Sequence, residues 1–136
     1  MDKISSNIIA DFELLSDWEE KYRFVIELGQ ELESLEQNVK IDQNLIRGCQ
    51  SKVWLVCKYD EKKLYFYGDS EALITKGIVS LIIKLFSGRS AKEILEDNLE
   101  KTLNIIGLSS HLSMQRANGL LMMIKSIKNY ARNYEQ

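Results

Sequence analysis

Only one stretch of this chain alternates apolar and polar residues with a period of two, and it constrains the fold more than any other feature. It covers residues 44–68, whereas the residues before 40 and after 73 repeat their apolar positions at helical spacing. A period of two is typical of strands, and a spacing of three to four residues is typical of helices. The sequence therefore predicts an α+β fold in which helices cover a small three-stranded antiparallel sheet.

The predicted strands occupy residues 45–47, 53–60 and 63–67. In the middle strand Cys57 shares a face with apolar residues, and the last strand is rich in aromatic side chains, which strands favour. The polar run "YDEKK" separates these two strands and is typical of a hairpin connection. The three strands are therefore expected to follow one another as an antiparallel meander.

Two helices are predicted before the sheet, one at residues 5–14 and one that begins at residue 18. Ser16 and Glu19 have the spacing of a capping box, in which two side chains satisfy free N–H groups at a helix start. Gly29 is predicted to end the second helix, because glycine readily adopts the left-handed conformation found at helix ends.

More helices are predicted after the sheet. Residues 74–86 are apolar on nearly every face, so this helix is expected to run through the core. Ser90 and Glu93 form a second capping box, at the start of the helical segment "AKEILEDNLEKTLNII". The final helix is predicted to begin at about Ser113. Its apolar stripe consists of Ala117, Leu120, Leu121, Ile124, Ile127, Ala131 and Tyr134.

The composition predicts a single soluble domain over residues 1–136. Hydrophobic residues make up 45% of the chain, which is enough for a core, and no proline or low-complexity segment interrupts it. No apolar run approaches the roughly 20 residues that span a membrane. The first residues also lack the basic and apolar regions of a secretory signal, so we expect a cytoplasmic location without membrane contact.

Charge is unevenly distributed along the chain. Residues 1–42 carry a balance of −7 and the remaining residues a balance of +5. A nucleic-acid-binding domain usually has a stronger basic excess with interleaved aromatic residues, so no nucleic-acid partner is predicted. The asymmetry is interpreted as solvated helix faces, with a docking surface for a charged protein partner as the alternative.

The two cysteines differ in their surroundings. Cys57 is predicted to be a small buried hydrophobic residue of the middle strand. Cys49 lies in the connection "LIRGCQSKVWL", where Gly48 allows a sharp turn and Gln50 and Ser51 bring hydrogen-bond donors close to the sulfur. A thiol at such a turn contributes little to a core, and as a thiolate it is a nucleophile.

No histidine that could act as a general base for a catalytic cysteine lies near Cys49 in the sequence. His111 is the only histidine of the chain and is more than sixty positions away in sequence. Two cysteines and one histidine are also few for a zinc or iron–sulfur site, which usually takes three or four strong ligands. These observations favour a thiol that accepts and passes on a chemical group while a partner supplies the chemistry.

The residues around Cys49 resemble the active-site sequence of the SufE family of sulfur-acceptor proteins. The block "GCQSKVWL" carries the likeness. Three further blocks occur in the family's order around it, namely "WEEKYRFVIELGQEL", "GDSEALITKGI" and "HLSMQRANGLLMMIKSI". The resemblance covers most of the chain and is shared by the SufE and CsdE branches. It implies a fold similar to that of IscU-type scaffolds, a small antiparallel sheet with helices packed against it.

The resemblance also implies a function for Cys49. This residue would receive a sulfane sulfur, as a persulfide, from a SufS-type cysteine desulfurase whose own cofactor is pyridoxal phosphate. The protein would stimulate that enzyme and pass the sulfur to the SufBCD complex for iron–sulfur cluster assembly. Gly48, Gln50 and Ser51 would support the Cys49 loop. The chain would act with the desulfurase and not as an enzyme alone, with no cofactor or metal of its own.

Arg116 is expected to contribute to partner binding, because the block "LSMQRANG" places it in the first turn of the final helix, near the Cys49 loop. A cation is disfavoured by the helix dipole at this end, so a carboxylate, a carbonyl group or a partner must compensate it. Two other functions stay open, an IscU-like scaffold that binds a metal or cluster and an adaptor that leaves Cys49 idle. The sequence also leaves open whether the chain forms a homodimer.

Overall fold

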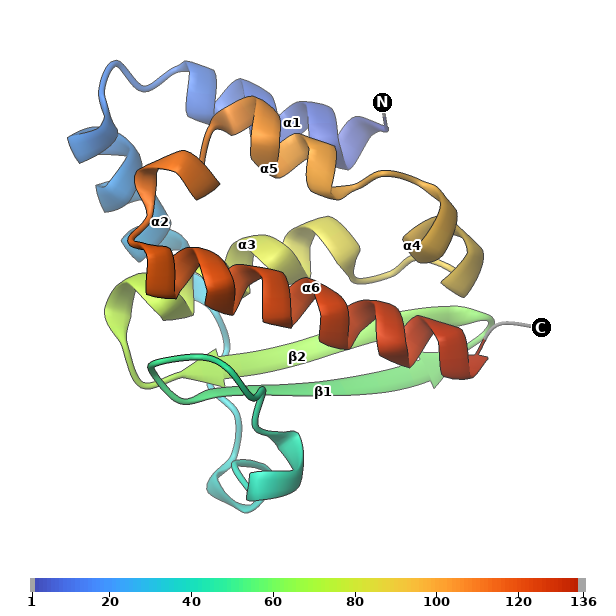
Figure 1. Ribbon diagram of the computed structural model, residues 1–136. Helices are drawn as coiled ribbons and strands as arrows, with labels where there is room; N and C mark the ends of the chain where they lie inside the picture. Colours follow the sequence, from blue (N-terminus) through green and yellow to red (C-terminus); the bar gives the residue numbers. More distant parts are fainter. Residues whose placement is uncertain (1, 135–136) are drawn as a thin grey trace.

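The computed structural model describes residues 2–134 and confirms the α+β class. Figure 1 shows helices α3 (Leu73–Phe86) and α6 (Met114–Tyr134) lying between a small sheet and a second layer that contains α1 (Lys3–Glu13) and α5 (Glu100–Ile106). Buried apolar side chains from all these elements form one continuous core. No helix within residues 2–134 has the length and hydrophobicity needed to cross a membrane.

The sheet consists of β1 (Val53–Asp60) and β2 (Lys63–Ser70), which pair antiparallel with Cys57 opposite Phe66. Glu61 and Lys62 form the two-residue turn between them, and both have positive φ angles, 47° and 67°. This conformation matches the natural twist of a hairpin. The polar connection predicted from the sequence is therefore a tight turn.

The predicted third strand at residues 45–47 is not a strand in the structure. Only an isolated antiparallel bridge joins Leu45 to Trp54 at the outer edge of β1. A 3-10 turn at Asp42–Asn44 ends directly before this bridge, and Gly48, with a φ of +86°, turns the chain soon after it. Too few extended residues remain between the two turns to form a ladder.

Helix α2 (Trp18–Glu31) shows a shifted version of the predicted capping box. The N-cap is Asp17, whose carboxylate accepts a hydrogen bond from the Glu20 N–H at 2.9 Å. The Glu20 carboxylate in turn accepts from the Ser16 N–H at 3.0 Å. The prediction of Ser16 with Glu19 is wrong by one residue, because aspartate is as good an N-cap as serine.

Gly29 does not end α2, contrary to the prediction, because the helix continues to Glu31. Gly29 lies where α2 crosses α3, and a Cβ added to it would stand 2.7 Å from the Gly77 nitrogen. A Cβ added to Gly77 would stand 2.0 Å from the Val25 carbonyl oxygen. The two glycines therefore allow backbone-to-backbone contact that any side chain at these positions would prevent.

The segment predicted as one helix after Ser90 forms two, α4 (Ala91–Glu96) and α5. The capping box of Ser90 and Glu93 is confirmed, with the Glu93 N–H donating to the Ser90 Oγ at 3.1 Å. The break falls at Asp97 and Asn98. Both side chains compete with the helix for backbone hydrogen bonds and so weaken a helix interior.

Helix α6 begins as predicted after Ser113, whose Oγ accepts from the Arg116 N–H at 3.2 Å. Most of the predicted stripe faces the core, but Leu121 is 60% exposed and Tyr134 is 37% exposed, so these two residues do not belong to it. Two further 3-10 turns occur, at Gln37–Val39 and Ser109–His111, the second of them leading into α6.

Candidate functional site

Cys49 lies at the tip of the loop that connects the Leu45 bridge to β1. The turn depends on Gly48, whose φ of +86° is a conformation that side chains disfavour. A Cβ at Gly48 would also stand 3.0 Å from the Met122 side chain of α6. The loop therefore folds back onto α6 and carries the thiol with it.

The Cys49 thiol is half-buried between this loop and α6. Its Sγ–H donates a weak hydrogen bond to the Gly119 carbonyl, with 3.8 Å between sulfur and oxygen. Gly119 is buried, and the side of the glycine that lacks a Cβ faces the sulfur. The final helix therefore partly shelters the Cys49 thiol from solvent.

A cavity of about 40 Å³ lies beside the thiol, between the Cys49 loop and the first turns of α3 and α6. It brings together three residues that the sequence singled out in the loop, Cys49, Gln50 and Ser51, with Arg116 from α6. The remaining lining residues are Thr75, Ile78, Gln115, Gly119 and Met123. The cavity is thus built by three separate segments that meet at the sulfur.

Burial raises the pKa of the Cys49 thiol above its ordinary value. A raised pKa means that the thiol is protonated, and therefore a poor nucleophile, at neutral pH. His111 does not lie beside the thiol. Its ring is stacked on the Trp18 ring, with 3.8 Å between the ring centroids, and its Nδ1 lies 3.0 Å from the Gly107 carbonyl oxygen. The structure therefore keeps His111 apart from the cavity and at the α2 side of the molecule.

Arg116 is exposed and lines the cavity from the first turn of α6. Within residues 2–134 no carboxylate forms an ion pair with its guanidinium. The helix dipole predicted that a carboxylate, a carbonyl group or a partner would compensate the charge of Arg116. Among residues 2–134, no carboxylate does so. The positive charge remains available at the mouth of the cavity.

The second thiol belongs to a different region. Cys57 is half-buried on the core-facing side of β1, and burial raises its pKa to about 11. No group of three or more histidine, cysteine, aspartate or glutamate side chains that could hold a metal ion occurs within residues 2–134. Cys49, Cys57 and His111, the ligands that an IscU-like scaffold would need, are not brought together.

The far end of the Cys49 loop is fixed by β2. The Ser70 Oγ donates to the Lys52 carbonyl at 2.8 Å, and the Ser70 N–H donates to the Asp69 carboxylate at 2.8 Å. Asp69 is only 2% exposed and forms ion pairs with Lys40 at 3.1 Å and Lys76 at 3.3 Å. Asp69 thus ties together the segment before the loop, the end of β2 and α3.

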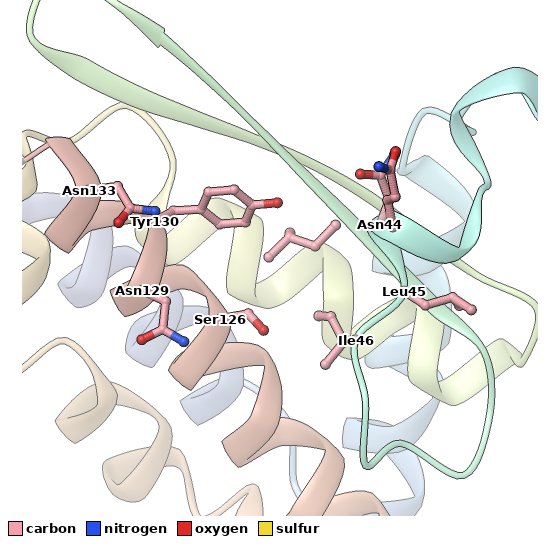
Figure 2. Close-up of a pocket in the computed structure, with 9 residues that line it drawn as sticks. Asn44, Leu45, Ile46, Ser126, Asn129, Tyr130 and Asn133 are labelled. Atoms are coloured by element: carbon pink, nitrogen blue, oxygen red, sulfur yellow. The ribbon is translucent and has the colours of Figure 1, made fainter.

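Figure 2 shows a second hollow, farther along α6, of about 210 Å³. The Tyr130 ring extends from α6 toward residues 44–46, and Ser126, Asn129 and Asn133 line the helix side. These groups offer hydrogen bonds, but none of the lining residues within 2–134 carries a thiol, imidazole, carboxylate or amine. The described lining thus differs from that of the smaller cavity, which contains the Cys49 thiol.

Sequence reasoning missed five residues of the Cys49 cavity, namely Thr75, Ile78, Gln115, Gly119 and Met123. Thr75 lies in a helix that the sequence pattern describes only as apolar, and Gly119 has no turn or motif around it that marks its role. The only available signal was their position in the family-like blocks "GDSEALITKGI" and "HLSMQRANGLLMMIKSI".

Comparison with known proteins gives consistent results. A family model named SufE and described as an Fe-S metabolism associated domain matches residues 6–131. An uncharacterized SufE-like protein of Rhizobium meliloti is 42% identical to this chain, and the match covers 91% of each of the two chains. An uncharacterized SufE-like protein of Rhizobium etli is 40% identical, and the match covers 92% of this chain and 87% of the relative. The cysteine desulfuration protein SufE of Wigglesworthia glossinidia brevipalpis is 38% identical, over 93% of this chain and 88% of its own.

A solved structure shares the fold. The solution structure of a hypothetical protein from Thermus thermophilus matches with a TM-score of 0.78, and the match covers 96% of this chain and 95% of that one. The two sequences are 16% identical, so this likeness concerns the fold alone.

Proposed function

Because the chain belongs to the SufE family, we propose that it is a sulfur-transfer protein of iron–sulfur cluster assembly with Cys49 as its sulfur acceptor. The donor is a SufS-type cysteine desulfurase, which the protein stimulates, and the SufBCD complex receives the sulfur. The name of the 38% identical relative, a cysteine desulfuration protein, supports the class of reaction.

The transfer is a thiol–persulfide exchange. The Cys49 thiolate attacks the terminal sulfur of a persulfide on the donor's cysteine, and a new S–S bond forms on Cys49 as the donor's S–S bond breaks. The donor's cysteine leaves as a thiolate and takes up a proton, while Cys49 has lost its own. The sulfane sulfur moves without net oxidation or reduction, so the chain needs no redox cofactor for this step.

One observation carries the proposal: the Cys49 thiol stands on a turn, against a cavity whose lining residues within 2–134 carry no imidazole or carboxylate. A hydrolase-type cysteine would need such a base beside it. A sulfur acceptor does not, because the donor's persulfide is already activated. The raised pKa of the Cys49 thiol also keeps it unreactive until a partner draws the loop out of its shelter.

Arg116 is proposed to contact the desulfurase. Its exposed guanidinium stands at the mouth of the cavity, and no acidic side chain of residues 2–134 is paired with it. An acidic residue of the partner would compensate its charge next to the helix N-terminus. Arg116→Ala is expected to weaken desulfurase binding about tenfold with thermal stability retained, whereas lost stability with intact binding would assign Arg116 to the fold.

The test of the acceptor role is intact-mass analysis after mixing the protein with desulfurase and cysteine. One sulfur atom, about 32 Da, is expected on wild type and on Cys57→Ser, the matched control, and none on Cys49→Ser. Sulfur on Cys57 in the Cys49→Ser protein would contradict the assignment.

A further inference from the structure

Thr75, a residue with a hydroxyl group, belongs to the wall of the Cys49 cavity. It lies in the first turn of α3, is 8% exposed, and lines the cavity together with the thiol. A threonine hydroxyl inside a helix can bond a carbonyl of its own helix, and threonine there divides between two χ1 rotamers, so the hydroxyl can also turn to another acceptor.

The cavity has the polarity of a site for a small anion next to an apolar wall. Arg116 and Gln115, both exposed, bring N–H donors to its mouth, while Ile78 and Met123, both buried, provide apolar contacts. No carboxylate of residues 2–134 belongs to its lining. An acceptor-only group that carries negative charge on a polarisable atom therefore fits better than a neutral or cationic one.

The cavity volume selects the size of the occupant. About 40 Å³ is space for one or two atoms of the size of a water oxygen. An amino-acid substrate such as cysteine is too large. A single additional sulfur atom attached to Cys49 fits, and the face of Gly119 without a Cβ lies directly beside the sulfur.

From these observations we infer that the cavity holds the terminal sulfur of a Cys49 persulfide, and that the Thr75 hydroxyl donates a hydrogen bond to that sulfur. The inference rests on the proposed function and adds a residue to which the sequence pattern assigns no role. In the anionic persulfide the outer sulfur carries the charge. A hydrogen bond to the charged form stabilises it, so Thr75 lowers the pKa of the persulfide and keeps it deprotonated for transfer.

The experiment loads the sulfur without the desulfurase. Inorganic polysulfide transfers one sulfur to the Cys49 thiolate as one of its own S–S bonds breaks, and the shortened polysulfide leaves with the electron pair. Every protein carries Cys57→Ser, so Cys49 is the one thiol present. The loaded protein is freed of reagent, and its alkylation rate by iodoacetamide is followed by intact mass from about pH 4 to pH 9. The midpoint of the rate profile reports the persulfide pKa.

Thr75→Val removes the hydroxyl and keeps the β-branched shape, and its midpoint is expected to rise by roughly half a unit to one unit, a three- to tenfold change in acid dissociation constant. Thr75→Ser, which retains the hydroxyl, is the matched control and should follow wild type. The unloaded Thr75→Val protein should stay folded with a melting temperature close to that of wild type, because valine preserves the β-branched shape of the side chain.

Three outcomes would overturn the inference. They are equal midpoints for wild type and Thr75→Val, an equal rise in Thr75→Ser and Thr75→Val, and a Cys49 that takes no sulfur from polysulfide. Failure of the proposed function has a different pattern, in which polysulfide loads Cys49 but the desulfurase with cysteine does not.

Discussion

A Cβ at residue 119 would stand 3.4 Å from the sulfur of Cys49, so Gly119 and Cys49 are in contact at the one position of α6 where the helix surface has no side chain. The relationship explains a glycine inside a helix, which costs about 1 kcal/mol relative to alanine. The same contact limits the space around the Cys49 sulfur, both in the free thiol and in the proposed persulfide.

The first prediction concerns Gly119→Ala. The unloaded protein should gain up to about 1 kcal/mol of unfolding free energy, because 3.4 Å is an ordinary contact distance and alanine favours the helix. The persulfide should react with dithiothreitol about tenfold faster, since the methyl group crowds the extra sulfur toward solvent. Asn118→Ala, at a neighbouring position of the same helix, is the control. A persulfide equally long-lived in both variants would contradict the packing argument.

The second prediction concerns the two thiols of the resting protein. A pKa of about 11 leaves roughly one Cys57 side chain in ten thousand as thiolate at pH 7, and burial raises the pKa of Cys49 as well. Iodoacetamide should therefore label Cys57 about a hundredfold more slowly in the native protein than in urea, and should label Cys49 more slowly as well. Adding desulfurase should accelerate labelling of Cys49 only. Peptide mass analysis of a labelling time course measures both rates. Rapid labelling of Cys57 in the native protein would contradict the prediction.

The third prediction is that Asp69→Asn lowers the free energy of unfolding by roughly 2 to 4 kcal/mol, because it leaves two lysines without the buried carboxylate. Burial alone would raise the pKa of Asp69, but the Lys40 hydrogen bond, backbone N–H groups and Lys76 outweigh it and lower the pKa. Lys76→Gln, which removes one of the two partners, should cost less, about 1 kcal/mol. Urea unfolding of both variants at pH 7 tests the order.

The fourth prediction concerns stability in acid. Burial would raise the pKa of the Asp2 carboxyl group, but hydrogen bonds and charge from the buried Arg89, at 3.0 Å, and from Ser5 lower it to about 2. A lowered pKa means that this contribution is present above about pH 4 and is lost as the pH falls toward 2. Asp2→Asn keeps an N-cap side chain but removes the charge, so its urea midpoint should fall less steeply over this range.

The control for that comparison is Asp11→Asn, which makes the same change at an exposed position of α1. Its urea midpoint should follow the wild-type curve between about pH 5 and pH 2. Parallel curves for wild type and Asp2→Asn would assign the acid sensitivity to other groups.

The sequence predicted those elements whose signal is local. The alternation in residues 53–67 and the capping box of Ser90 and Glu93 are set by neighbours along the chain, and both are present. The expected strand at residues 45–47 failed because its flanking turns limit its length, which periodicity does not show. Gly29 was interpreted as a helix end, although its role depends on a second helix distant in sequence.

The site was predictable to a similar extent. Cys49 and its loop neighbours were predicted from a turn and a family-like block, and Arg116 was expected near them; all but Gly48 line one cavity in the structure. Thr75 had no such signal, because helix α3 is apolar on most faces and which of its residues line the cavity depends on packing against α2 and β2. Tertiary contacts decide such orientations, and they are absent from the sequence pattern.

The contact between Gly29 and Gly77 has a consequence for how the cavity can open. Gly77 is two residues after Thr75, and its backbone touches α2, so this part of α3 has no room to shift toward α2. The α3 side of the cavity is therefore held in place by close packing against α2. A hinge at Gly48, whose φ is positive, would open the cavity from the loop side, and a partner would then need to displace only a few residues of chain.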